Sequence, residues 1–256
     1  LSAIKLVLAI MQKPEIKAAL IDLDDTLTYT NDLIIAAFSE IAAELSRTGR
    51  VEFDDIYREV TRLNYEKYQK FHVNRFRSWP PFLDSLQSVF RLSSNEVAFA
   101  RDQIGTIYTT VPKVMDGAFE LLDFYGRQGI IRCPITHADA EWTDFKLKAT
   151  GLWSYIDPAF IVIADVNRAK GIQDYRFAMD RVGQNPENIL SMGDSIPGDI
   201  LPAVELGFGE IIHVDNGRSW GRYREGEVPT SVHRVTSLRE VPEIIAESRE
   251  VAILNR

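Results

Sequence analysis

Hydrophobic and polar residues follow three successive patterns along the chain. Residues 16–23 form a short apolar run that ends in carboxylates, which is typical of a strand buried on both faces. The pattern then changes to helical spacing, as at Phe38 and Ile41. Two more amphipathic stretches follow, and the Trp-Pro-Pro of residues 79–81 breaks the series between them. We therefore predict helices without a strand over residues 30–111.

From residue 112 the chain alternates between short apolar runs and amphipathic segments. The runs predict strands at 129–136, 158–164, 188–192, 210–214 and, weakly, 233–235; the segments predict helices at 117–125, 139–150, 171–182, 197–206 and 238–248. Such alternation is typical of a doubly wound parallel α/β sheet covered on both faces. The predicted architecture is one α/β core, residues 1–29 and 112–256, with a helical insertion at 30–111.

The composition excludes several classes of protein and of site. The 256 residues contain one cysteine, Cys133, which excludes a disulfide framework and a four-cysteine zinc site. A net charge of −8 argues against a nucleic-acid partner. No segment has the roughly 18 apolar residues of a membrane span. The apolar residues 1–11 are interpreted as an N-terminal extension, with a signal peptide as the alternative; the stretch is short and has no basic leader. We expect a cytoplasmic protein without a membrane partner, either a monomer or a homodimer.

Polar side chains follow three of the predicted strands where each strand ends. They are Asp22, Asp24 and Asp25 after the first strand, Thr136 and His137 after the second, and Asp194, Ser195 and Asp199 after the fourth. The carboxyl ends of the strands form the ligand crevice of an open α/β sheet, so these residues are expected to meet there. Carboxylates that converge in this way repel one another unless a cation lies among them, and their oxygen ligands indicate Mg²⁺.

The spacing of the first two carboxylates indicates phosphoryl transfer. Asp22 is the last residue that points out of the strand, and Asp24 has already turned toward the far side of the crevice. One carboxylate as nucleophile and a second as proton donor is what transfer through an aspartyl-phosphate requires. Thr136 and Lys170 are candidates to stabilise the charge of the phosphoryl oxygens.

Four motifs in this order resemble those of the haloacid dehalogenase superfamily. They are Asp22-x-Asp24-x-Thr26-Leu27 after a buried strand, Thr136 at a strand end, Lys170 ahead of a helix, and Gly193-Asp194-Ser195-x-x-x-Asp199. The helical insertion between the first and second motifs is similar to the cap of phosphoglycolate-phosphatase-like members. The resemblance implies a Rossmann-like core with an inserted all-helical cap.

The resemblance also implies roles for individual residues. Asp22 is implied as nucleophile and Mg²⁺ ligand, and Asp24 as general acid and base that gives its backbone carbonyl to the metal. Thr136 and Lys170 are implied to bind phosphoryl oxygens. Asp194 would complete the metal site, with Asp199 beside it as ligand or support.

Two positions depart from the family pattern. His137 stands where the second motif usually has Asn, and it is a candidate substrate contact or a space-filling neighbour. Gly171 follows Lys170 where Pro is common, so Lys146 and Arg168 remain alternative phosphate-binding cations.

The predicted function is a Mg²⁺-dependent phosphatase that acts on a small phosphorylated metabolite. Asp24 favours this function over 2-haloacid dehalogenation, because a halide leaving group needs no proton. A dehalogenase, a phosphomutase, a phosphonate hydrolase and a catalytically silent binding module remain as alternatives.

The insertion contributes further candidates. His72, Arg75, Arg77 and Trp79 form a basic and aromatic cluster, which is either a solvated face or a patch that closes over an anionic substrate. Tyr29, Thr30 and Asn31 are candidates for a hinge. Asp25 is interpreted as a turn or capping residue.

Overall fold

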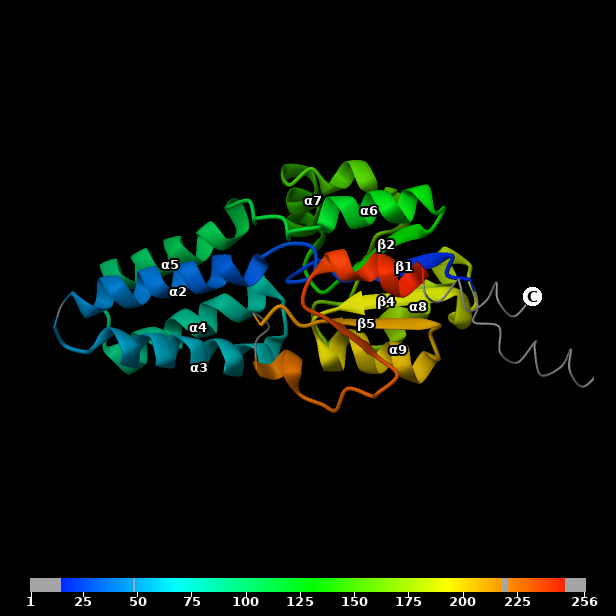
Figure 1. The fold of residues 1–256 in the computed structure, drawn as a ribbon. Coiled ribbons are helices and arrows are strands. Elements are labelled where there is room, and N and C mark those ends of the chain that lie inside the picture. The colour runs from blue at the N-terminus through cyan, green and yellow to red at the C-terminus, as the bar shows by residue number, and fades with distance from the viewer. Residues whose placement is uncertain (1–14, 48, 218–220, 247–256) are drawn as a thin grey trace, which may run out of the picture.

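The computed structural model describes residues 15–47, 49–217 and 221–246. The predicted N-terminal extension 1–11 and the last two residues of the helix predicted at 238–248 lie outside these ranges. The described chain is elongated, with a sheet and its covering helices at one end and a helical bundle at the other (Figure 1). None of the described helices is both long and apolar enough to span a membrane.

Six parallel strands form one sheet. In chain order they are β1 (Ala18–Ile21), β2 (Ile131–Thr136), β3 (Val162–Ile163), β4 (Ile189–Gly193), β5 (Glu210–Val214) and β6 (His233–Val235). They lie side by side in the order β3-β2-β1-β4-β5-β6, and every neighbouring pair is parallel. The order reverses direction between β1 and β4, which is where ligands bind in open α/β sheets.

Helices cover both faces of the sheet. The helices α6 (Ala118–Arg127) and α7 (Ala140–Ala149) lie on one face, and α8 (Ile172–Val182) and α9 (Leu201–Leu206) lie on the other (Figure 1). Side chains alternate along β1, so Ala19 and Ile21 pack with the first pair of helices and Ala18 and Leu20 with the second. The strand is therefore buried on both sides, and the predicted doubly wound α/β fold is confirmed.

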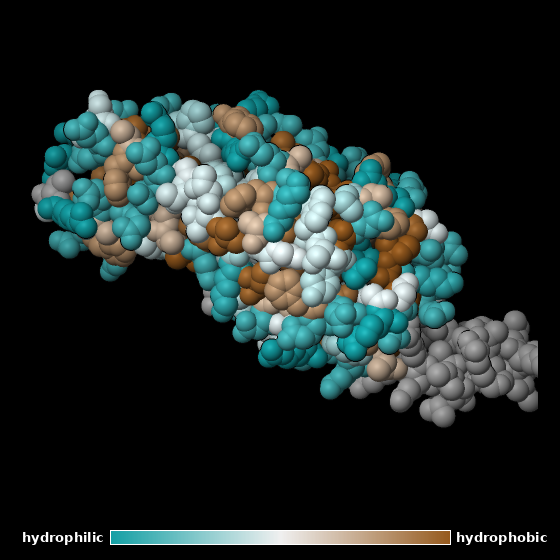
Figure 2. Space-filling view, turned by 90° about the horizontal axis from the view of Figure 1, so that it is seen from above, coloured by the Kyte–Doolittle hydropathy of each residue, from teal (hydrophilic) through white to brown (hydrophobic). Residues whose placement is uncertain are grey.

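Between β1 and α6 the chain forms four helices: α2 (Thr30–Ser46), α3 (Phe53–Phe71), α4 (Arg75–Phe90) and α5 (Ser94–Thr109). They share a hydrophobic cluster of their own, in which Phe38 and Phe82 stack with ring centroids 5.9 Å apart. The bundle thus has a core separate from the two clusters of the sheet. Seen from above, its surface is mainly hydrophilic, with small hydrophobic areas between polar side chains (Figure 2).

One prediction for this region is wrong: Pro80 and Pro81 do not break the series but lie inside α4. Each proline removes an N–H from the helix, which costs about 3 kcal/mol in an unsupported helix. Asn74 caps the start of α4 by accepting a hydrogen bond from the Arg77 N–H at 3.2 Å. The burial of Trp79 and its neighbours in the bundle core stabilises α4 and offsets the cost of the two prolines.

Three other elements differ from the predictions. Only two residues of the strand predicted at 158–164 pair with β2, because Asp157 caps a 3₁₀ turn at Pro158–Phe160. The helix predicted at 197–206 begins as a π-helical turn, Ile196–Ile200, and continues as α9. The last predicted helix opens with a 3₁₀ turn at Leu238–Glu240.

Candidate active site

The carboxyl ends of β1 and β4 bring together acidic residues that are about 170 positions apart in the sequence. Asp22 follows β1, Asp194 follows β4, and Asp199 lies in the π-helical turn after β4. The Asp22 N–H donates to the Met192 carbonyl at 2.9 Å, so the pairing of the two strands continues into the site. One carboxylate oxygen of each of the three aspartates lies within 4.8 Å of the others, and all three are buried. The predicted convergence is therefore observed.

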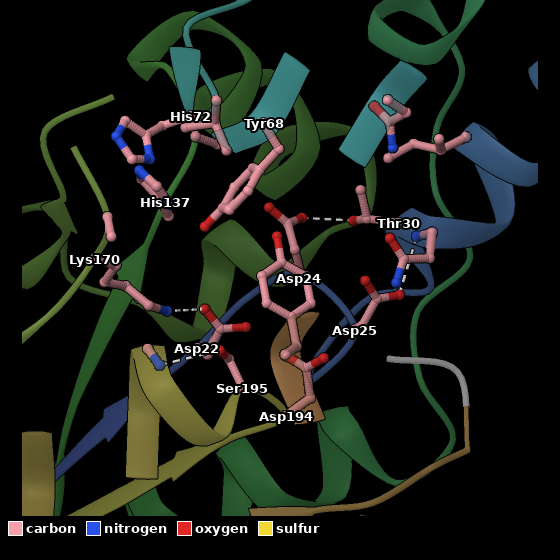
Figure 3. A pocket seen from close by; sticks show the side chains of 18 of the residues that line it. Asp22, Asp24, Asp25, Thr30, Tyr68, His72, His137, Lys170, Asp194 and Ser195 are labelled. Carbon is pink, nitrogen blue, oxygen red and sulfur yellow. Dashed lines mark hydrogen bonds and ion pairs between the residues drawn. The ribbon is translucent and has the colours of Figure 1, made fainter. Parts of the chain in front are cut away.

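Lys170 lies against this acidic cluster (Figure 3). Its ammonium donates to a carboxylate oxygen of Asp22, lies 2.6 Å from Oδ1 of Asp199 and donates to the Ile135 carbonyl at 3.3 Å. Burial lowers the pKa of Lys170, but the carboxylates of Asp199 and Asp22 more than offset this, so the pKa lies well above its usual value. Burial together with Asp199 and Asp194 raises the pKa of Asp22, against the opposing effect of Lys170.

Asp199 is held on both oxygens. Its Oδ1 accepts a hydrogen bond from the Tyr175 hydroxyl at 3.0 Å, and its Oδ2 accepts one from the Ser195 N–H at 3.0 Å. A Cβ on Gly193 would lie 2.3 Å from the Asp199 carboxyl carbon, so only glycine fits there. The glycine of the fourth motif thus makes room for its last aspartate. Tyr175 gave no signal in the sequence.

Asp24 bonds to a different set of residues. Its Oδ1 accepts a hydrogen bond from the Thr30 hydroxyl at 2.5 Å and pairs with the Lys146 ammonium. Lys146 is fully buried in α7, and its ammonium lies 4.0 Å from the centroid of the Trp142 ring. The three candidate cations are therefore distinguished: Lys170 contacts Asp22, Lys146 contacts Asp24, and Arg168 forms a two-bond pair with Asp174.

Asp25 occupies the turn between β1 and the bundle. It adopts a positive φ of 62°, and its Oδ1 accepts a hydrogen bond from the Asn31 N–H in the first turn of α2 at 3.0 Å. The Asn216 side chain donates to the Asp25 carbonyl at 2.6 Å. Burial raises the pKa of Asp25 well above its usual value. These contacts are those of the turn and capping residue predicted from the sequence.

A cavity of about 280 Å³ lies between the acidic cluster and the bundle. Asp22, Asp24, Lys170 and Asp194 line its sheet end. The bundle contributes, among others, Asn64, Tyr68, His72, Trp79 and Tyr108. In Figure 3, Tyr68 points its hydroxyl toward the carboxylates. A ligand in this cavity would contact both parts of the molecule.

The two candidates at the carboxyl end of β2 have different surroundings. Thr136 is fully buried and is not among the side chains that line the cavity; its hydroxyl has no hydrogen-bond partner among the described residues. Its contact with phosphoryl oxygens stays a prediction. His137 lines the cavity, and burial together with the Lys170 charge lowers its pKa to about 4, so the ring is neutral at pH 7.

A family of known proteins matches most of the chain. The family model for haloacid dehalogenase-like hydrolases matches residues 16–207. The chain belongs to this family. The match includes all four motifs and the helical bundle, and it confirms both the predicted resemblance and the prediction that the chain is a hydrolase.

Individual relatives are more distant. The pyrophosphatase PpaX of Bacillus velezensis is 25% identical over 186 residues, which are 72% of this chain and 77% of that protein. A haloacid dehalogenase-like hydrolase from Xanthomonas campestris superposes with a TM-score of 0.74 at 15% identity, covering 94% of this chain and 95% of its own. The magnesium-bound hydrolase YfnB of Bacillus subtilis superposes with a TM-score of 0.68 at 17% identity, covering 91% and 100%. The two structural similarities concern the fold.

Proposed function

We propose that the protein is a Mg²⁺-dependent phosphatase that hydrolyses a small phosphate monoester through an aspartyl-phosphate on Asp22. The observation that carries this proposal is the buried group of Asp22, Asp194 and Lys170 at the sheet end of a cavity. The phosphate chemistry of the pyrophosphatase relative supports it. We further propose that residues 30–111 act as a cap on a catalytic core formed by residues 1–29 and 112–256.

The donor set fits Mg²⁺. The three clustered side chains offer only carboxylate oxygens, which are hard ligands. Lys170 supplies one positive charge to them, and a divalent cation would balance the negative charge that remains. Asp22 and Asp194, with the backbone carbonyl of Asp24, would hold the ion. Asp199 accepts hydrogen bonds on both oxygens and contacts Lys170, so we assign it to positioning the lysine. Bound Mg²⁺ would supply charge compensation for the phosphoryl oxygens.

The side chains of the protein divide the remaining work. Lys170 holds one oxygen of Asp22 and brings a positive charge to the place where phosphoryl oxygens gain negative charge. Asp22 attacks phosphorus with its carboxylate, and Asp24 gives a proton to the departing alcohol and later takes one from the hydrolytic water. Thr30 and Lys146 orient Asp24. The bundle excludes bulk water from the cavity.

Asp24 also bears on the alternative functions. Halide release requires no proton donor, and the two side chains that hold Asp24 keep its carboxylate at the cavity. This observation favours phosphate hydrolysis over 2-haloacid dehalogenation. A catalytically silent binding module would lack Asp22, Asp24 or Lys170, whereas all three side chains line the cavity here.

The test is hydrolysis of p-nitrophenyl phosphate with and without Mg²⁺ by wild type and by Asp22→Asn. Wild type is expected to require Mg²⁺. The variant is expected to lose activity by about 10⁴-fold or more, since it lacks the nucleophile. Asp144→Asn, which removes an exposed carboxylate from α7, is the matched control and should retain activity. Equal activity of Asp22→Asn and wild type would overturn the proposal.

A further inference from the structure

Seven ring side chains line the cavity, and they fall into two groups. The first group is centred on Tyr68 in α3, which meets His72, His137 and Tyr223 edge to face at centroid distances of 5.8, 6.5 and 6.2 Å. Its members come from both the bundle and the core. Because His137 is neutral at pH 7, its ring adds a planar surface there and no positive charge.

The second group consists of Trp79, Tyr108 and Trp142. The Trp79 indole N–H donates to the Tyr108 hydroxyl at 2.6 Å, and the Tyr108 and Trp142 rings lie 4.8 Å apart. These contacts fix the ring planes relative to one another. The cavity therefore has a rigid aromatic lining on the side away from the phosphoryl site.

Charges are few on this lining. Among the described residues that line the cavity away from the strand ends, the charged side chains are Lys67 and Glu225. The Lys67 ammonium lies 3.1 Å from the centroid of the Trp79 ring. The basic cluster predicted from the sequence divides here, because His72 and Trp79 line the cavity but Arg75 and Arg77 do not. Arg75 instead pairs with Asp139 at 3.3 Å and Glu141 at 2.7 Å.

This lining discriminates between kinds of leaving group. A second phosphate, as in pyrophosphate, requires several cations or paired guanidinium donors, and the opposite charges of Lys67 and Glu225 do not supply them. A polyhydroxylated sugar requires many matched hydrogen-bond partners. The lining includes polar side chains such as Asn64, Gln69 and Ser78, but most of its surface is apolar. Rings instead offer flat apolar surface, on which another ring stacks or meets edge to face. The volume of about 280 Å³ is small for a ligand site, where about 300–1,000 Å³ is usual, and suits a single ring system.

We infer that the leaving alcohol of the substrate carries an aromatic or similarly planar apolar ring, which binds against Tyr68 and its ring neighbours. The inference rests on the proposed phosphatase function and names its substrate class. It distinguishes the chain from its pyrophosphatase relative, whose second product is inorganic phosphate.

The experiment compares substrates whose phosphate chemistry is matched. 2-Phenylethyl phosphate and glycerol 3-phosphate are both esters of primary alcohols, so they differ mainly in what occupies the cavity. With wild type and Mg²⁺, kcat/KM is expected to be about tenfold or more higher for the phenylethyl ester. Pyrophosphate is expected to be the poorest of the three.

Variants of Tyr68 test whether the ring of the substrate binds against this residue. Tyr68→Ala should lower the preference for the phenylethyl ester over the glycerol ester about tenfold, mainly through KM, whereas Tyr68→Phe should retain it. Tyr57→Ala removes a tyrosine from the same helix that does not line the cavity and should leave the preference unchanged.

The two proposals fail in different ways. Absence of Mg²⁺-dependent p-nitrophenyl phosphate hydrolysis would overturn the phosphatase function itself. Hydrolysis of that ester without a preference for the phenylethyl ester would overturn the substrate class alone. A preference that Tyr68→Ala leaves intact would overturn the binding of the ring against Tyr68.

Discussion

The two ends of the cavity are built in different ways. At the sheet end, the functional groups sit within a few residues of a strand end, as Asp22 does after β1 and Asp194 after β4. Their positions follow from the pairing of the strands. At the bundle end, Tyr68 and Tyr108 lie near the ends of α3 and α5, and Trp79 lies near the start of α4. They meet through the packing of the bundle.

Under the proposed function, the sheet end would carry out the chemistry and the bundle end would select the substrate. The sheet end carries the charges, and its rigid parallel strands fix them. The bundle end carries rings and few charges. Changes at the sheet end should therefore slow every phosphate ester alike, and changes at the bundle end should alter the relative rates of different esters.

Asp24→Asn is expected to slow turnover more than a substitution of Lys170, Asp194 or His137. Loss of a general acid and base slows turnover by about 10²- to 10⁴-fold. With p-nitrophenyl phosphate the leaving group needs no proton, so phosphorylation of Asp22 continues while hydrolysis of the phosphoenzyme slows. Stopped-flow absorbance should then show a burst of p-nitrophenol close to one equivalent. A variant with unchanged steady-state turnover would contradict the role of Asp24.

Lys170→Met should have the next largest effect, a fall in kcat of about 10²- to 10³-fold for all esters. The variant also leaves the carboxylates of Asp22 and Asp199 buried without their cation, so urea denaturation should show a loss of about 3–5 kcal/mol. Lys148→Met, at an exposed position on α7, is the control. If the variant lost activity toward only one of the esters, Lys170 would act in substrate selection, as the bundle end of the cavity does, instead of in the chemistry.

The difference between the sheet end and the bundle end also explains which parts of the fold and of the candidate site could be predicted from the sequence. Strands buried on both faces give continuous apolar runs, and the residues after them meet at one edge, so the sheet, Asp22 and Asp194 could be predicted. The start of α2 could be placed because the helical period begins soon after the turn at Asp25.

Other features were not predictable because they depend on which helix faces meet. The sequence suggested Lys146 only as an alternative phosphate-binding cation, and its burial against Asp24 was not predicted. Tyr68 reads as one more aromatic residue in α3, and only the packing of the bundle directs it into the cavity. Pro80 and Pro81 signal a break that the buried side chains around them prevent.

Asp194→Asn tests the cation site within the sheet end. With one carboxylate neutralised, the Mg²⁺ concentration at half-maximal activity should rise about 10- to 100-fold, while kcat at saturating Mg²⁺ falls less. Titration of activity with Mg²⁺ measures both quantities. Asp123→Asn, at an exposed position on α6, should leave the Mg²⁺ dependence unchanged. An unchanged dependence in Asp194→Asn would remove this residue from the metal site.

His137 lines the cavity between the sheet end and the bundle end. The pH dependence of stability tests whether its ring stays neutral in the folded protein. Its pKa of about 4 lies below the usual 6.5, mainly because the ring is buried. Between pH 6.5 and 4 the unfolded chain therefore binds a proton that the folded protein does not, so the folded protein loses stability as the pH falls. Wild type should lose about 1–2 kcal/mol more than His137→Gln between pH 7.5 and 4.5, after allowance for its partial exposure. Urea denaturation at both pH values measures the difference; equal losses in wild type and His137→Gln would mean that folding does not lower the pKa of this ring.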